Sequence, residues 1–198
     1  ASTKAFLAQI TAAYLLGLYL AQLNKKLFSG QIKDILADLH AIPGKIQEIL
    51  DDKEQVKELA RSMADTSSVL FLGRNVGYPV AMEGALKLKE LAYIHAEGFA
   101  AGELKHGPIA LIDDGQAVFV VMPSPMDRHS LHAKVVSNIQ EVRARGARTF
   151  AVAERGDAAV RGQAEIVFEV PETQPMLMPL LTTVPVSYTH LTLPTKRI

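Results

Sequence analysis

The sequence has no cysteine among its 198 residues, and this absence excludes several classes of protein. Without cysteine there is no disulfide scaffold, no thiolate metal site and no cysteine nucleophile. An excess of either charge is also lacking, because 21 Lys and Arg residues balance 21 Asp and Glu residues. A nucleic-acid-binding module or a polybasic membrane anchor carries a basic excess, so we expect neither kind of partner.

The overall composition is that of an ordinary globular protein. Hydrophobic residues make up 48% and charged residues 21% of the chain, which is far from a disordered composition. The lack of cysteine is compatible with a reducing cytoplasm, where we expect this protein to act. The chain begins Ala1-Ser2-Thr3, with neither a Met nor a signal-peptide pattern, so we expect it to be a fragment.

One stretch, from Ala5 to Leu23, is apolar enough to imitate a membrane span. Its length is close to the roughly 20 residues that a span needs. A helix that is apolar on nearly all sides is also typical of a buried core or interface helix. Three polar residues interrupt the stretch and no second span follows it: Gln9, Thr11 and Gln22. We therefore expect a buried helix of a soluble fold and no membrane partner.

Further helical patterns follow this stretch. Apolar residues recur at helical spacing over 32–39 and again over 46–50, and a third pattern covers 53–64. Pro43-Gly44 lies between the first two patterns. Because proline removes a backbone donor and clashes with the preceding turn, we expect the helix to break there.

Beyond residue 67 the pattern changes to short apolar runs that alternate with helices. Runs that are apolar throughout indicate strands of a parallel sheet covered on both faces, whose ligands bind at the carboxyl ends of the strands. The fold class is therefore α/β, with three layers and an open sheet. We expect strands at 68–73, 117–122, 148–153 and 165–170, and helices at 77–94 and 131–145.

Three ionisable residues share one face of the helix expected at 77–94. Glu83, Lys87 and Glu90 are spaced by four and three residues. A solvated ladder of ion pairs is the ordinary interpretation, and spacing alone favours it. The alternative is a site carboxylate held beside an ammonium that tunes its pKa.

Two loops offer weaker candidates. The segment from Gly73 to Gly77 joins a strand to a helix, and such a loop can bind an anion. No phosphate-loop motif is present, so we favour a simple tight turn. His95 and His106 flank a glycine-rich segment crowded with ionisable groups, the kind of loop in which catalysis tends to sit. Their spacing to Glu97 and Glu103 matches no common zinc pattern, so we expect no metal.

Two more histidines lie near the start of the helix expected at 131–145. His129 and His132 are three residues apart. We expect them to lie at the surface or to cap the helix.

One long string identifies a family. EGALKLKELAYIHAEGFAAGELKHGP, from Glu83 to Pro108, closely resembles the isomerase half of the glucosamine-6-phosphate synthases, also called isomerising glutamine–fructose-6-phosphate aminotransferases. The opening ASTKAF, the strand FLGR and the later NIQEVRARG support the match. The resemblance runs from Ala1 to about Val186, and the string is too long and unusual in composition for chance.

The resemblance implies a domain organisation. The family's isomerase half holds two sugar-isomerase (SIS) domains, each a parallel five-stranded sheet between helix layers. Residues 1–52 match helices from the end of the first SIS domain and the linker, and 53–186 match most of the second. Residues 187–198, SYTHLTLPTKRI, resemble nothing in the family and look like translated cloning sequence. Lys196 is therefore not credited as the catalytic lysine of the family's tail.

The resemblance also implies roles for single residues. Glu90 corresponds to the base that moves a proton between C1 and C2 of the sugar, and Lys87 to a lysine beside that base. His106 corresponds to the histidine that opens the fructose 6-phosphate ring, and it serves the neighbouring subunit's site, which implies a homodimer. Ala1 and Ser2 correspond to substrate-binding positions.

The implied reaction converts fructose 6-phosphate and glutamine to glucosamine 6-phosphate and glutamate, without cofactor or metal, in amino-sugar biosynthesis toward UDP-GlcNAc. The family's glutaminase domain, with its cysteine nucleophile, and its S-Q-S-G-type phosphate loop do not occur in this chain. We therefore expect the 198 residues to be inactive alone. Two alternatives stay open, namely a non-catalytic module that binds sugar phosphates and a related SIS fructosamine-6-phosphate deglycase.

Overall fold

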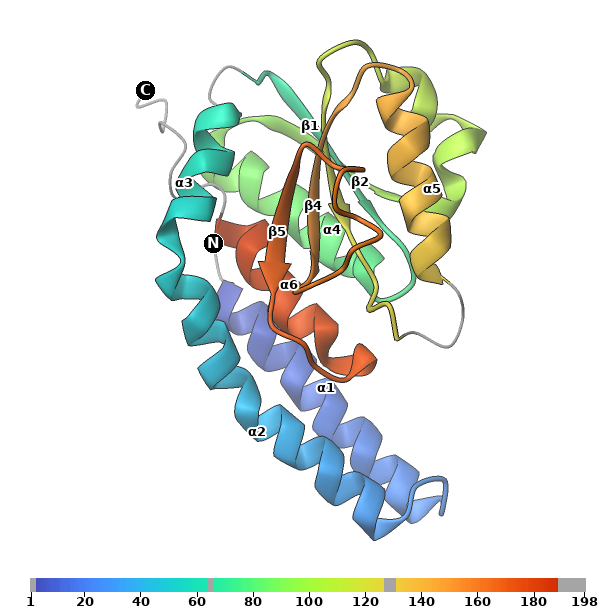
Figure 1. The fold of residues 1–198 in the computed structure, drawn as a ribbon. Helices are drawn as coiled ribbons and strands as arrows, with labels where there is room; N and C mark the ends of the chain where they lie inside the picture. The colour runs from blue at the N-terminus through green and yellow to red at the C-terminus, as the bar shows by residue number, and fades with distance from the viewer. Residues whose placement is uncertain (1–2, 64–65, 127–130, 189–198) are drawn as a thin grey trace.

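A five-stranded parallel sheet forms the centre of the structure (Figure 1). The computed structural model describes residues 3–63, 66–126 and 131–188. The four expected strands are confirmed to within one residue, and a fifth, β2, was not expected. In spatial order the strands are β2 (His95–Ala100), β1 (Ser68–Gly73), β3 (Ala117–Val121), β4 (Arg148–Glu154) and β5 (Ile166–Val170).

Strand β2 escaped prediction because its sequence, HAEGFA, is not an apolar run. It is an edge strand that pairs with β1 alone and is only partly buried, so it can form without a continuous apolar sequence. Gly98 allows the strand to lie close to the neighbouring helix, since a Cβ there would lie 2.9 Å from Cα of Met82. The segment that we interpreted as a catalytic loop is therefore half strand.

Helices cover both faces of the sheet and confirm the three-layer α/β fold. On one face lie α4 (Gly77–Lys87) and α6 (Met178–Tyr188). On the other lie α5 (Leu131–Arg143) and the short helices η2 (Ala101–His106) and η3 (Pro108–Leu111). Alternate residues along each strand point to opposite faces, so the sheet divides two separate apolar cores.

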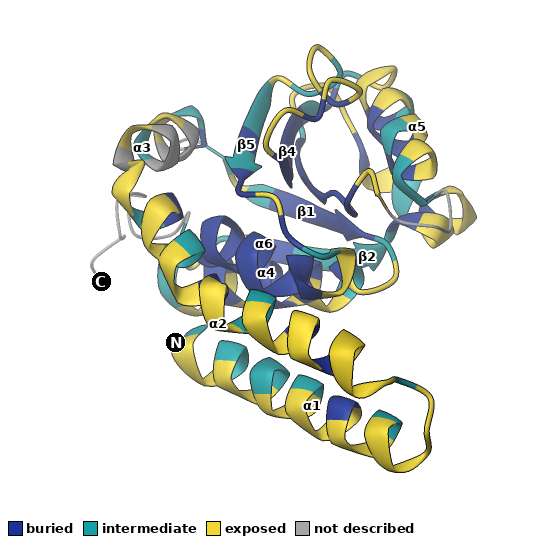
Figure 2. Cartoon of the chain, turned by 60° about the horizontal axis from the view of Figure 1, so that its bottom comes forward, coloured by how far each residue is buried: buried dark blue, intermediate teal, exposed yellow. Residues whose placement is uncertain are grey.

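The helices before the sheet form an arm that reaches away from it (Figure 2). The arm consists of α1 (Thr3–Leu23) and α2 (Ser29–Asp51), and the short α3 (Lys53–Ser62) leads from it to the sheet. Leu7, Ile10 and Tyr14 of α1 pack on the core below α6, whereas the second half of α1 lies beside α2 in solvent.

The expected burial of α1 against the sheet is not found, and burial against a partner stays a prediction. Only 6% of its most apolar 18 residues is buried, although its length and composition alone would allow it to cross a membrane. The sheet face that α1 approaches is already covered by α4 and α6, so only the first half of this 21-residue helix packs on that core. Its side chains left exposed include Leu15, Leu16, Tyr19, Leu20 and Leu23.

The expected break at Pro43 is also wrong, because α2 continues through Pro43 and Gly44. A proline inside a helix costs a hydrogen bond, but packing can offset that loss. Ile42 and Ile49, on either side of the proline, are each 4% exposed and belong to the core between α2 and α6. Burial of this face accounts for a helix that continues through an unfavourable residue.

At the other end of the chain, α6 continues through Ser187 and Tyr188, the first two residues of the segment we assigned to a foreign tail. Ser187 is fully buried. Residues 189–198 lie outside the described residues. The tail, like the domain boundaries at 52 and 186, stays a prediction.

Gly84 is the tightest point between α4, α6 and the sheet. A Cβ there would overlap Cγ1 of Val186 and lie 2.8 Å from Cε1 of Phe71. We predict that Gly84→Ala lowers the free energy of unfolding by about 2 kcal/mol, because the overlap forces α4 and α6 apart. Gly17→Ala is the matched control, since a Cβ at Gly17 meets nothing within 4 Å and alanine favours the helix. Urea unfolding measures both, and equal effects would contradict the prediction.

Candidate active site

A buried ammonium lies at the centre of the candidate site. Lys87 Nζ is 3.1 Å from Glu83 Oε1 and 3.1 Å from Glu90 Oε2. The side chains of Lys87 and Glu83 are only 4% and 10% exposed, whereas that of Glu90 is 44% exposed. The solvated ladder favoured by spacing is therefore wrong for the Glu83–Lys87 pair, and the arrangement is a buried ion pair that reaches one accessible carboxylate.

The surroundings of Lys87 decide its charge. Burial lowers the pKa of Lys87, but hydrogen bonds and charges from Glu83 and Glu90 together outweigh burial and raise it above its ordinary value. The ammonium is thus charged at neutral pH. Glu90 therefore has a fixed positive charge at hydrogen-bonding distance.

The backbone changes form at this point. The α-helix ends at Lys87, and Leu88–Ala92 form a π-helical turn, η1, that holds Glu90. Tyr93 then takes a left-handed conformation with φ of 55°. The continuous helix expected over 77–94 is therefore wrong in its last turns. Single π-helical turns are frequent at functional sites, and this one leads Glu90 out of the core into solvent.

The structure does not bring His106 to Glu90 within one chain. Glu90 precedes β2 and lies toward the amino ends of the strands, whereas His106 follows β2 at their carboxyl ends. The six residues of β2, about 20 Å of extended strand, lie between the two along the chain. His106 is 72% exposed, with Nδ1 2.7 Å from Glu103 Oε2, and His95 is similarly exposed beside Glu97.

The remaining candidates have other surroundings. Ala1 and Ser2 lie outside the described residues, so their predicted part in substrate binding stays a prediction. In the loop after β1, the N–H groups of Gly77 and Tyr78 donate to carbonyl oxygens within the turn and are not free for an anion. A Cβ at Gly73 would overlap the Gly77 carbonyl oxygen, so this glycine is explained by the tight turn.

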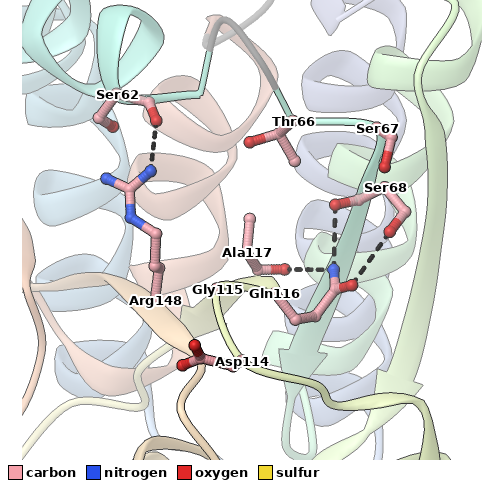
Figure 3. Close-up of a pocket in the computed structure, with 9 residues that line it drawn as sticks. All are labelled: Ser62, Thr66, Ser67, Ser68, Asp114, Gly115, Gln116, Ala117 and Arg148. Carbon is pink, nitrogen blue, oxygen red and sulfur yellow. Dashed lines mark hydrogen bonds between the residues drawn. The ribbon is translucent and has the colours of Figure 1, made fainter.

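A cavity of about 340 Å³ lies at the amino ends of β1, β3 and β4 (Figure 3). Arg148 beside it donates to the Ser62 carbonyl at 2.6 Å and pairs with Glu165 at 2.6 Å. Gln116 bonds to the hydroxyl and carbonyl of Ser68. These contacts tie α3 and the strands together, and none of the predicted site residues lines this cavity.

Sequence comparison places these features in a family. The SIS domain profile matches residues 62–193. The chain belongs to the SIS domain family. It is 66% identical over 185 residues to a glutamine–fructose-6-phosphate aminotransferase (isomerizing) of Corynebacterium efficiens and 56% identical to one of Mycobacterium tuberculosis. These alignments cover 93% of this chain and 30% of each relative, so the chain spans under a third of their length.

A solved structure agrees with this assignment of the SIS chain. The C-terminal domain of glucosamine-fructose-6-phosphate aminotransferase from Francisella tularensis superposes with a TM-score of 0.87 at 35% identity. The match covers 97% of this chain and 53% of that one. A tagatose-6-phosphate ketose/aldose isomerase from Clostridium novyi, at 17% identity and a TM-score of 0.72, shares the fold.

A second buried polar cluster lies at the carboxyl ends of β3 and β4 of the SIS domain, and sequence reasoning missed it. His132 Nε2 is 2.5 Å from Asp157 Oδ2, and both side chains are largely buried, so the expected surface or capping role of His132 is wrong. His129 lies outside the described residues. Glu154 is 5% exposed, and its Oε2 has no hydrogen-bond partner among the described residues. Glu154 and Asp157, two ionisable residues close behind an apolar run, were the signal that could have found the cluster.

The buried Glu83 gives the first prediction at this site. We predict that Lys87→Met lowers the free energy of unfolding by about 3 kcal/mol, because it leaves the Glu83 carboxylate buried without its partner. Lys105→Met is the matched control, since Lys105 pairs with Glu141 at the surface and its loss costs under about 1 kcal/mol. Urea unfolding at neutral pH compares the two, and equal losses would show that the Glu83–Lys87 pair is not effectively buried.

Glu154 gives a prediction about pH. Burial raises its pKa, the Ser124 hydroxyl opposes this rise, Glu172 and Asp157 add to it, and His132 opposes it. The folded state therefore binds the Glu154 proton more tightly than the unfolded state. The stability that this proton contributes is complete below the unfolded pKa of about 4.3 and is lost as pH rises through the raised folded pKa.

Glutamine imitates the protonated acid, so Glu154→Gln should raise the free energy of unfolding at pH 7 and leave it unchanged near pH 3. Urea unfolding across this pH range measures the difference. Glu58→Gln on the exposed face of α3 is the control and should give the wild-type profile throughout. A Glu154→Gln variant that is less stable at pH 7 would show that the carboxylate is stabilising when ionised.

Proposed function

We propose that this chain supplies the proton-transferring carboxylate, and the ammonium beside it, of an isomerising glutamine–fructose-6-phosphate aminotransferase. That enzyme converts fructose 6-phosphate and glutamine to glucosamine 6-phosphate and glutamate. The observation that carries the proposal is the buried Lys87 held 3.1 Å from the accessible Glu90, in a chain 66% identical to an aminotransferase of that name.

Glu90 has the properties that the isomerisation requires. Converting a ketose imine to an aldose amine needs one group that removes a proton from C1 and returns it to C2. A carboxylate on a rigid turn can do both, provided that it is open to the substrate. Glu90 is 44% exposed, and its backbone is anchored between α4 and β2.

Lys87 complements this carboxylate. When C1 loses its proton, negative charge builds up on the substrate, and a preorganised cation nearby stabilises it. Two carboxylates keep the Lys87 ammonium charged, and its side chain cannot move away from them without breaking both ion pairs. We propose that it both orients Glu90 and polarises a substrate oxygen.

The separation of Glu90 and His106 supports a site shared between subunits. Ring opening moves a proton between the anomeric hydroxyl and the ring oxygen, and an imidazole suits that step. His106 is exposed beyond the far end of β2 from Glu90, so it serves another molecule's Glu90 more readily than its own. We therefore propose a homodimer in which each site takes Glu90 from one subunit and His106 from the other.

Two further parts of the proposal concern partners and location. The family's glutaminase uses a cysteine nucleophile and this chain has no cysteine, so glutamine hydrolysis is assigned to residues outside these 198. We propose a cytoplasmic location, because the relatives' names describe an enzyme that uses a sugar phosphate and glutamine.

The test uses an enzyme in which residues 1–186 replace the matching segment of the Corynebacterium efficiens relative. Glu90→Gln and His106→Ala should each lower glucosamine 6-phosphate formation at least about 100-fold, the usual contribution of a general acid or base. When the two variants are co-expressed, half of the dimers carry one intact site of two, so about a quarter of the activity should return. Formation of glucosamine 6-phosphate from fructose 6-phosphate and glutamine is the measurement.

Two controls frame this experiment. Glu58→Gln, an exposed carboxylate on α3, should keep full activity, and the unaltered 198-residue chain alone should form no product. If Glu90→Gln keeps full activity, Glu90 is not the base. If the mixed variants recover nothing, the site is not shared between subunits.

A further inference from the structure

We propose that Glu83 is a positioning residue of this site: its buried carboxylate anchors the Lys87 ammonium so that the ammonium reaches Glu90 while staying charged. This inference rests on the proposed function, in which Glu90 is the base. Nothing in the resemblance assigned a role to Glu83, and its burial became visible only in the structure.

The geometry ties the three groups into one chain of contacts. Glu83 lies one helical turn before Lys87, the favourable order for an ion pair at this spacing, and its oxygen is 3.1 Å from Nζ. Glu90 lies three residues after Lys87, also at 3.1 Å. Among the described residues, these two carboxylates take two of the three donors of the ammonium, which leaves one for a substrate oxygen.

The elements packed most closely on α4 offer no replacement for Glu83 among the described residues. These elements are β1, β2, β3, α6 and η1. Strands β1 and β3 carry no ionisable side chain, and α6 carries only the phenol of Tyr188. His95 and Glu97 of β2 pair with each other, and η1 adds only Lys89 and Glu90.

The charge balance explains why a third group is needed. A Lys87 paired with Glu90 alone would be a buried ammonium whose single partner is half in solvent, and burial favours the neutral amine. Glu83 supplies a second negative charge from inside the core, so Lys87 keeps an anionic partner when Glu90 moves toward the substrate.

The experiment is a titration of Lys87 in the 198-residue chain, followed by NMR of the labelled lysine side chain. Glu83→Gln should lower the pKa of Lys87 by at least about one unit, since a neutral amide replaces one of its two anionic partners. Glu83→Asp keeps the charge and should restore most of the shift. Glu97→Gln on β2 is the matched control and should leave the Lys87 titration unchanged. An unchanged titration in Glu83→Gln overturns the proposal.

A second variant decides the matter if Glu83→Gln does not fold. In Glu90→Gln only Glu83 remains beside Lys87, so the pKa of Lys87 should stay at or above its ordinary value. A fall below that value would mean that burial acts alone and that Glu83 is no anchor, which overturns the proposal. Because neither titration requires turnover, these results are separate from the activity of Glu90→Gln in the grafted enzyme, which tests the proposed function.

Discussion

The close approach of α4 to α6 and the sheet is the constraint on which the rest of this structure depends. Gly84 allows it, because any side chain there would overlap Val186 and press on Phe71. The stretch of α4 around Gly84 is buried, and Glu83 and Lys87 on either side of it are buried too. An ion pair of ordinary helical spacing is therefore a buried one here.

The same constraint bears on where the proposed chemistry occurs. Glu83 and Lys87 are buried, while the π-helical turn brings Glu90 to the surface. The candidate site thus consists of an exposed carboxylate, Glu90, supported by a buried ion pair, and the described residues leave that carboxylate open to solvent. The carboxyl ends of the strands, where α/β sheets bind ligands, hold instead the separate His132–Asp157 pair and a carboxyl group with a raised pKa.

The parts of the fold that repeat a simple pattern could be predicted from sequence. Strands β1, β3 and β4 are apolar because both of their faces are covered, and edge strand β5 still carries the apolar run Ile166–Phe168, so these runs located all four to within one residue. Edge strand β2 and the π-helical turn could not be predicted, because partial burial and a change in helical period leave no such run. The continuity of α2 through Pro43 and the burial of Glu83 depend on distant residues packing against them. Resemblance singled out Lys87 and Glu90, but only the structure shows that they touch and that His106 lies elsewhere.

The exposed arm of α1 and α2 has a consequence for the behaviour of these 198 residues in solution. Folding buries the sheet on both faces but leaves a helix with exposed Leu15, Leu16 and Tyr19 standing in water. Extended apolar surface is the property that quality-control systems read as incomplete folding, and it exposes a protein to chaperones, proteases and aggregation. By itself, the 198-residue chain therefore carries an apolar surface that favours self-association, whatever the strength of its sheet.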